Sequence, residues 1–313
     1  MRAADFLPQC LQPRRITADQ LGWGTALLTV GLFEKVVLAD TFLAPVADRV
    51  YGLAEHAGFA DAWIGTLAFS GQIFFDFAGY STCAIGVATM LGFVIPRNFR
   101  CPYAAIGFSD FWRRWHVSLS SWLRDYLYIP LGGNRKGGRR TLINLMLTML
   151  LGGLWHGAAW RFVAWGGLHG LYLAAERGIR RAAGARRGET PLDERPYRRV
   201  VLALATYALV CVTWVFFRAT DFGSALHLSG AMLGGGLLSA DPGGPSVLLR
   251  GSARIVLALT VVMLAGQWWL RDRTLEQVAA RLPRWGRALA LALMWICLAM
   301  APGDDRAFIY FQF

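Results

Sequence analysis

Apolar residues dominate long stretches of this chain, and few charges interrupt them. One long run extends from residue 63 to 95 and has Asp76 as its single formal charge. A second run, from residue 142 to 175, has Arg161 as its single formal charge. Runs of this length and composition are typical of segments that enter a lipid bilayer, where the backbone has to satisfy its own hydrogen bonds. The pattern therefore predicts an all-α integral membrane protein.

Both long runs have a length that fits the bilayer poorly. A single helix over 63–95 would be about 50 Å long, whereas the hydrocarbon core is about 30 Å thick. We therefore expect this run to tilt, break or fold back, with Gly71 and Gly79 as candidate break points. The run over 142–175 is too long for one upright helix and short for two complete spans. It predicts a pair of short, broken or re-entrant helices, which are tolerated only beside protein or a water-filled cavity.

The remaining apolar segments and the loops between them predict a topology of six to eight membrane segments. Arginine-rich segments at 96–140 and 176–199 indicate the cytoplasmic side, and the acidic loop 40–61 and the C-terminal tail the external side. Further spans are expected at 21–39, 200–217, 255–270 and 288–301. The whole chain, 1–313, is predicted to form a single membrane domain.

The formal net charge of +12 changes little in this picture. In a soluble protein it would suggest nucleic acid, but here the arginines lie between apolar runs, where they set orientation and meet anionic lipid headgroups. The sequence has no polar region large enough for a nucleic-acid-binding domain, so we expect membrane lipid and not nucleic acid as a partner. Five scattered cysteines without a CxxC pair predict neither disulfides nor a metal site.

The segment from residue 108 to 126 repeats its apolar positions with the 3.6-residue period of a helix. Aromatic residues on one face and arginines on the other predict an amphipathic helix in the membrane interface. His116 lies at the edge of the apolar stripe, about one turn from Trp112. A surface anchor without chemistry is the alternative. The following IPLGGNRKGGRR, 129–140, predicts a turn and a basic loop that suit an anionic headgroup or a cofactor phosphate.

The stretch GGLWHGAAW, 152–160, places His156 inside the second long apolar run. An imidazole in apolar surroundings is neutral and can act as a general base. Its glycines would let a substrate or a second backbone approach, and Trp155 and Trp160 could wall a tunnel. A structural interhelical hydrogen bond is the alternative. A second histidine, His169 in WGGLHGLYL, raises bis-histidine haem ligation, which is disfavoured because both histidines sit in one broken segment.

A polar stripe also crosses the first long run. Gln72, Asp76 and Tyr80 share one helical face in FSGQIFFDFAGYSTCAIG. These side chains either form an interhelical hydrogen-bond network or line a polar passage. We favour the network for Gln72 and leave both readings open for Asp76.

Taken together, four segments resemble the membrane-bound O-acyltransferase family. They are FFDFAGYSTCAIGVATMLGF, RNFRCPYAAIGFSDFWRRWHVSLSSWLRDYLYIPLGGNRKGGRR, LLGGLWHGAAWRFVAWGGLHGLYLAAER and the final FIYFQF. The resemblance is to the bacterial branch that contains alginate O-acetylation proteins and D-alanyl teichoic acid transferases. It is most specific over 72–176, which is the expected catalytic core. Members of this branch are usually longer, so the chain is expected to lack their N-terminal spans.

The resemblance implies a polytopic helical body, with broken or re-entrant helices, in a bacterial inner membrane. Such a protein passes an acyl group from a cytoplasmic thioester through a tunnel toward an acceptor on the far side. His156 corresponds to the family's central catalytic histidine and His116 to its other histidine. We expect no bound cofactor and no metal, with acetyl-CoA or another acyl thioester as donor substrate. The expected partner is a periplasmic acyltransferase or an exopolysaccharide acceptor.

These observations lead to a functional hypothesis with one alternative. The leading interpretation is an O-acetyltransferase that acts on a secreted polysaccharide, alginate or another exopolysaccharide. Its expected catalytic residues are His156 and His116, and its candidate tunnel-lining or substrate-lining residues are Asp76, Trp155, Trp112 and Tyr80. The alternative is a non-catalytic polysaccharide-export or channel component, which would use the same tunnel and basic face without acyl transfer.

Overall fold

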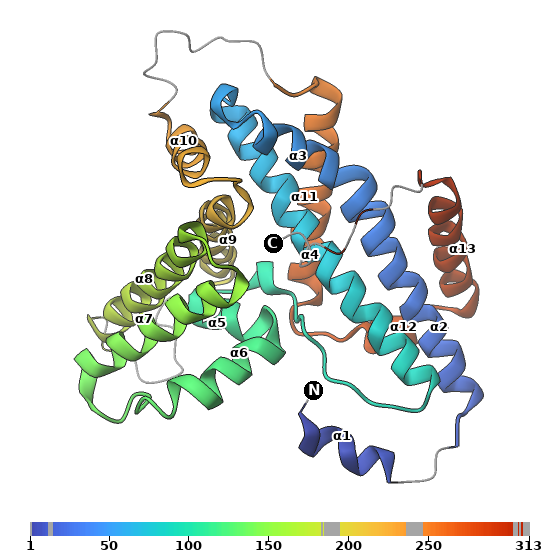
Figure 1. Ribbon diagram of the computed structural model, residues 1–313. Helices are drawn as coiled ribbons and strands as arrows, with labels where there is room; N and C mark the ends of the chain where they lie inside the picture. Colours follow the sequence, from blue (N-terminus) through green and yellow to red (C-terminus); the bar gives the residue numbers. More distant parts are fainter. Residues whose placement is uncertain are drawn as a thin grey trace. The chain divides into compact units, whose positions relative to one another are not determined.

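The computed structural model describes residues 2–11, 15–182, 184, 195–235, 247–302, 306 and 308. Every regular element within these residues is helical (Figure 1), which confirms the predicted all-α class. The elements follow one another as α1 (Ala3–Cys10), α2 (Ala18–Leu32), the π-helix η1 (Phe33–Leu43), α3 (Ala44–Gly52), η2 (Ala54–His56), α4 (Phe59–Met90), η3 (Pro102–Ala104), α5 (Phe108–Arg114), α6 (Val117–Leu123), the π-helix η4 (Arg124–Tyr128), α7 (Gly137–His156), α8 (Trp160–Ala182), α9 (Pro196–Arg218), α10 (Phe222–Met232), α11 (Arg250–Leu270), α12 (Leu275–Arg281) and α13 (Arg284–Met300).

Three helices of the described part are long and apolar enough to cross a membrane. They are α4, α9 and α11. This agrees with the expectation of a membrane protein, and the total of six to eight membrane segments stays a prediction. Parts of the arginine-rich segment 176–199 and most of the C-terminal tail lie outside the described residues.

Helix α4 runs without interruption from Phe59 to Met90, so the break points expected at Gly71 and Gly79 are wrong. A glycine inside a helix costs only about 1 kcal/mol, which a close tertiary contact can offset. A Cβ atom at Gly71 would lie 2.7 Å from Leu43 Cδ1, and one at Gly79 would lie 2.7 Å from Gly31 O. The two glycines therefore provide space for neighbouring chain segments.

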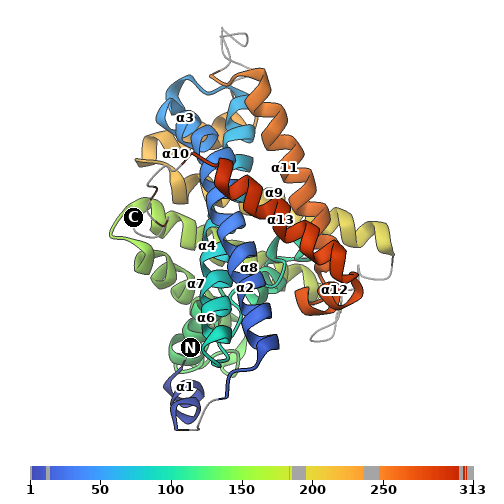
Figure 2. The same cartoon turned by 90° about the vertical axis from the view of Figure 1, so that its right-hand side faces the viewer.

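The chain forms two compact units. The first comprises Met1–Pro45, Gly71–Phe99 and Asp272–Gln312, and the second is built mainly from Val46–Ser70 and Arg100–Arg271. In the first unit, α13 packs against α2 and η1 (Figure 2). In the second, α8 packs against both α7 and α9. The assignment of 1–313 to a single membrane domain, with 72–176 as its catalytic core, stays a prediction.

In the first unit, glycines bring α2 and α4 into backbone contact. A Cβ atom at Gly24 would lie 2.7 Å from Gly86 O, and one at Gly31 would lie 2.5 Å from Gly79 O. A Cβ atom at Gly86 or Gly79 on α4 would likewise lie against the backbone of α2. Small residues are the usual means by which helices approach closely in a membrane, where no hydrophobic effect drives them together.

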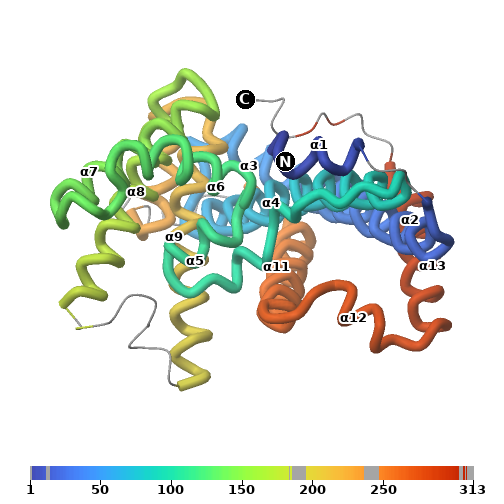
Figure 3. The backbone as a smooth tube through the Cα atoms, turned by 90° about the horizontal axis from the view of Figure 1, so that it is seen from below, coloured from blue at the N-terminus to red at the C-terminus, as the bar shows by residue number. Residues whose placement is uncertain are grey.

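In the second unit, α7 and α8 form an antiparallel pair (Figure 3). Helix α7 ends at His156 and α8 begins at Trp160, so the run over 142–175 does break into two helices. They have 20 and 23 residues and are not the short helices expected, and a re-entrant course stays a prediction. The two helices cross at Gly153 and Gly166, because a Cβ atom on either glycine would run into a backbone carbonyl of the other helix, Phe162 O or Met149 O. Glycine at both positions thus permits the pairing.

The amphipathic segment is not one helix, which corrects the expectation for 108–126. It divides into α5 and α6, followed by the π-helix η4. Trp115 has extended backbone angles, and His116 has the left-handed angles φ 43° and ψ 56°. The buried Trp115 ring stacks on Phe111 at 5.7 Å and contacts Trp214 at 5.0 Å between ring centroids. Tertiary packing of Trp115 therefore overrides the helical period.

We expect Gly166→Ala to destabilise the protein by about 1–3 kcal/mol, because the added methyl group overpacks the contact with α7. The measurement is the apparent melting temperature in detergent. The matched control is Gly178→Ala on the same helix, where a Cβ atom meets nothing within 4 Å. That control should be neutral or slightly stabilising, since alanine favours the helix. Equal melting temperatures for both variants would refute this account of the helix pair.

Candidate functional site

His156 is the last residue of α7 and lies among aromatic rings from three helices. Its ring centroid lies 4.9 Å from that of Trp155, 5.2 Å from Trp165 on α8 and 5.1 Å from Phe217 on α9, each in an edge-to-face arrangement. The chain turns directly after it at Gly157, where a Cβ atom would lie 2.5 Å from the Phe162 ring. The WHG sequence thus places an imidazole at a helix end inside an aromatic cluster.

His116 lies at the junction of α5 and α6 and is buried. Left-handed angles are uncommon outside glycine and concentrate at functional sites, where the surroundings hold them. The Ser118 hydroxyl lies 3.3 Å from His116 Nδ1. Residue 116 is outside the three candidate spans, and burial lowers its pKa to about 4 because an imidazolium loses its hydration there. The ring is therefore neutral at pH 7.

The structure brings His116 and His156 together in the second unit. An electrostatic interaction links the two imidazoles, although 40 residues separate them in sequence and they come from different helices. This agrees with the expectation that both belong to one site. Their catalytic roles stay predictions.

The other four candidate residues divide between the two units. Trp112 on α5 contacts Trp165 with ring centroids 5.8 Å apart, which places it in the aromatic cluster beside His156. Trp155 is 59% exposed and covers one edge of His156. Asp76 and Tyr80 belong to the first unit.

In the first unit, Asp76 is a partner in a buried group of charges. Lys35 Nζ lies 3.0 Å from both Asp76 Oδ2 and Asp40 Oδ1. Tyr80 is half exposed and stacks on Phe308 with ring centroids 4.7 Å apart. The contacts of Asp76 fit an interhelical network, and a tunnel-lining role for Asp76 and Tyr80 stays a prediction.

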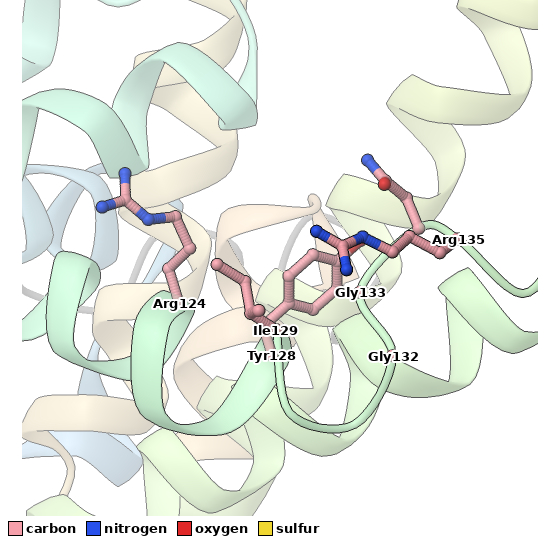
Figure 4. Close-up of a pocket in the computed structure, with 7 residues that line it drawn as sticks. Arg124, Tyr128, Ile129, Gly132, Gly133 and Arg135 are labelled. Atoms are coloured by element: carbon pink, nitrogen blue, oxygen red, sulfur yellow. The ribbon is translucent and has the colours of Figure 1, made fainter.

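A basic pocket follows α6. It has a volume of about 270 Å³ and is lined by Arg124, Tyr128, Ile129, Gly132, Gly133, Asn134 and Arg135. Figure 4 shows the Arg124 and Arg135 guanidinium groups with Tyr128 and Ile129 between them. Gly132 and Gly133 have positive φ values of 108° and 54°, which glycine adopts without strain and which give the loop its tight turn.

The loop of this basic pocket is tied to the helix that ends at His156. Asn144 Nδ2 on α7 donates to Gly133 O at 2.9 Å, and Asn144 is fully buried. The sequence predicted an anion-binding loop at 129–140. Arg135 of the pocket lies in this loop, whereas Arg124 lies outside the predicted segment. Arg124 lies before that loop, on a π-helical turn that the apolar period did not indicate.

Two further points concern ligands. Among the described residues, no group of three or more His, Cys, Asp or Glu side chains is placed to hold a metal ion. His169 Nε2 lies 3.0 Å from Thr213 Oγ1, so this nitrogen is engaged within the helix bundle. The sequence did not indicate the buried residues His169, Trp165 and Trp214 of this cluster as part of the site.

Comparison with known proteins adds a family and several relatives. A family model described as MBOAT, membrane-bound O-acyltransferase family, matches residues 20–211, which include both His116 and His156. The probable alginate O-acetylase of Pseudomonas putida is 46% identical over 233 residues, 74% of this chain and 45% of the relative. The peptidoglycan O-acetyltransferase of Helicobacter pylori is 41% identical over 211 residues, 67% of this chain and 38% of the relative.

A more distant relative has a third acceptor in its name. The teichoic acid D-alanyltransferase of Streptococcus thermophilus is 30% identical over 231 residues, 67% of this chain and 54% of the relative. The chain spans about half the length of the curated relatives it matches.

The pKa of His116 predicts how stability depends on pH. Because the folded pKa, about 4, lies below the ordinary value of 6.5, the unfolded chain binds the proton more readily between these values. Stability is therefore complete above about pH 6.5 and falls, by up to about 3 kcal/mol, as the pH drops toward 4. His116→Asn removes the titrating group, and asparagine tolerates left-handed angles. We expect the melting temperature of this variant to depend less on pH between pH 4 and 6.5 than that of the wild type.

The control for this measurement is His227→Asn, a change at an exposed histidine of α10. It should leave the pH dependence of the melting temperature as in the wild type. A wild-type slope in His116→Asn would mean that His116 is not the titrating group.

Proposed function

Because the chain belongs to the membrane-bound O-acyltransferase family, we propose that it transfers an acyl group, acetyl in the first place, from a thioester donor to a hydroxyl acceptor. The observation that carries this proposal is the meeting of His156 and His116, both in aromatic or buried surroundings, at the end of the α7 and α8 pair. Neutral imidazoles can accept a proton from a hydroxyl at pH 7.

The proposed step uses His156 as the general base. Its ring nitrogen takes the proton of the acceptor hydroxyl while the hydroxyl oxygen attacks the thioester carbonyl carbon. The carbon–sulfur bond then breaks, and the departing thiolate takes the proton back from the imidazolium. The products are an ester and a free thiol. Transfer through a covalent acyl-enzyme is the variant of this step that the same residues allow.

His116 would act on the carbonyl oxygen in this scheme. In the tautomer in which Ser118 donates to Nδ1, the Nε2 atom carries the proton and can donate to the developing negative charge. The neutral state of His116, which its burial favours, suits such a donor. A positive charge on His116 would oppose protonation of His156 and so weaken it as a base.

The basic pocket supports an anionic donor. Two guanidinium groups and a tight glycine turn are a common arrangement for phosphate groups. We propose that Arg124 and Arg135 bind a phosphate of the donor, acetyl-CoA or a carrier-bound acyl thioester. The hydrogen bond from Asn144 to the loop supports a fixed relation between this pocket and the helix of His156.

The acceptor is proposed from the relatives. Their names refer to alginate, peptidoglycan and teichoic acid. We propose a hydroxyl of a secreted polysaccharide, reached directly or through a periplasmic acyltransferase partner. Trp155 and Trp112 are the proposed lining residues of the second unit, and a lining role for Asp76 and Tyr80 is proposed for the first unit by itself. A multi-pass position in a bacterial inner membrane follows from the same proposal. A non-catalytic export or channel component is not favoured, since these relatives are named as acetylases or transferases.

His156→Ala, introduced at the native locus with all surrounding coding sequence in place, should lower the ester-linked acetyl content of the secreted polysaccharide at least 100-fold. Loss of a general base typically costs 10² to 10⁴ in rate. Polymer yield and the membrane level of the protein should not change. The control is His227→Ala, outside the site. Loss of polymer export with esters retained would favour the channel alternative, and unchanged esters would refute the proposed role of His156.

Arg124→Gln combined with Arg135→Gln should raise the KM for the thioester donor about ten-fold or more, because two charge-assisted hydrogen bonds to phosphate are lost. The turnover number should change less. The measurement is acyl transfer in membranes over a range of donor concentrations. Arg139→Gln combined with Arg140→Gln removes the same charge from exposed positions outside the pocket and is the matched control. An equal effect of both double variants would indicate general attraction by the basic surface.

A further inference from the structure

The aromatic cluster beside His156 holds buried polar atoms that the described residues do not pair. They are His169 Nδ1 and the indole Nε1 atoms of Trp112, Trp165 and Trp214. His169 is completely buried, and Trp165 and Trp214 are 2% and 1% exposed. Folded proteins rarely leave such atoms unpaired, and four in one cluster call for a physical explanation.

These atoms lie in one continuous group of rings from α5, α8 and α9. The ring centroid of His169 lies 4.9 Å from that of Trp165 and 5.1 Å from that of Trp112. Trp165 in turn lies 6.1 Å from Trp214 and 5.2 Å from His156. A single indole therefore separates His169 from the candidate general base.

The hydrogen bonds of Thr213 fix the protonation of His169. The Thr213 hydroxyl donates to Val210 O at 2.7 Å, and a hydroxyl has only one hydrogen to donate. Toward His169 Nε2, at 3.0 Å, the same hydroxyl must therefore act as the acceptor. In this arrangement His169 Nε2 carries the proton, and the buried Nδ1 has a lone pair that no described residue pairs.

The cluster thus offers one acceptor, His169 Nδ1, next to several N–H donors. A group that satisfies both kinds of partner has to donate one hydrogen bond and accept others. A carboxylate or a phosphate cannot donate to Nδ1, and a cation cannot accept from an indole N–H. A hydroxyl group does both.

We propose that His169 Nδ1, together with the indole N–H groups of Trp112 and Trp165, binds a hydroxyl group next to His156. Two sources have this chemistry, a buried water molecule and a hydroxyl of the acceptor substrate. In either case His169 is a positioning residue that acts beside the base. The substrate source rests on the proposed function, whereas the water source does not depend on it.

Two substitutions at position 169 separate this proposal from a purely structural role. In His169→Asn the amide reaches the position of Nδ1 and keeps an acceptor there, but it cannot reach Thr213. In His169→Gln the amide reaches the position of Nε2 and can keep the bond to Thr213, but the acceptor at the Nδ1 position is lost. If His169 binds a hydroxyl group, His169→Asn should be more active than His169→Gln. If His169 only packs and holds Thr213, His169→Gln should be the more active variant.

The experiment measures acetyl transfer in membranes from cells that express the full coding sequence. The acceptor is the strain's own polysaccharide after alkaline removal of its esters. We expect His169→Gln to lose at least ten-fold in kcat/KM and His169→Asn to stay within about three-fold of wild type. A rise in acceptor KM identifies the substrate hydroxyl as the bound group, and a fall in kcat at unchanged KM identifies water. Equal activity of the two variants, or higher activity of His169→Gln, overturns the proposal.

Thermal stability in detergent provides a readout that does not need acyl transfer. If water occupies the site, His169→Gln removes the acceptor for its hydrogen bond and leaves the water and the indole N–H groups incompletely hydrogen-bonded. The melting temperature then falls below that of His169→Asn. If the cluster is dry, His169→Gln removes an unpaired acceptor and melts at or above the wild-type temperature, which overturns the water form of the proposal. A failure of the proposed function would show instead as His156→Ala retaining full activity, so the two failures are distinguishable.

Discussion

The backbone contact between α7 and α8 at Gly153 and Gly166 is the constraint on which the candidate site depends. Because neither position has a side chain, the two helices approach until each meets a carbonyl of the other. This closeness sets His156, three residues after Gly153, against Trp165, one residue before Gly166. The aromatic cluster, the position of the base and the buried His169 all follow from this one crossing.

The first unit meets a different requirement of the membrane. Charges inside an apolar environment are costly unless they are paired. Lys35, Asp40 and Asp76 form such a pairing, and the π-helix η1 holds Lys35 and Asp40, five residues apart, within reach of one another. The glycine contacts between α2 and α4 bring Asp76 close enough to join them. These contacts fit a structural role for Asp76, and its tunnel-lining role stays a prediction.

The sequence predicted those features that depend on length and local composition. The helical class and the helix pair over 142–175 follow from the apolar runs, and both His116 and His156 were proposed for one site. The failures involve residues whose role is decided by a distant partner. Gly79 interrupts nothing because Gly31 lies against it, and the helix breaks at Trp115 because that ring packs on Trp214. Neither partner can be identified from the local pattern.

Helix α7 also sets a distance between the basic pocket and the candidate base. Its residue Asn144 holds the loop of the basic pocket, and its last residue is His156. Twelve residues of α-helix correspond to a rise of about 18 Å. A donor whose anionic group binds in that pocket therefore has to carry its reactive carbonyl on a long arm. The fixed spacing of Asn144 and His156 on one helix would then select donors by the length of that arm, before any contact with the acyl group itself.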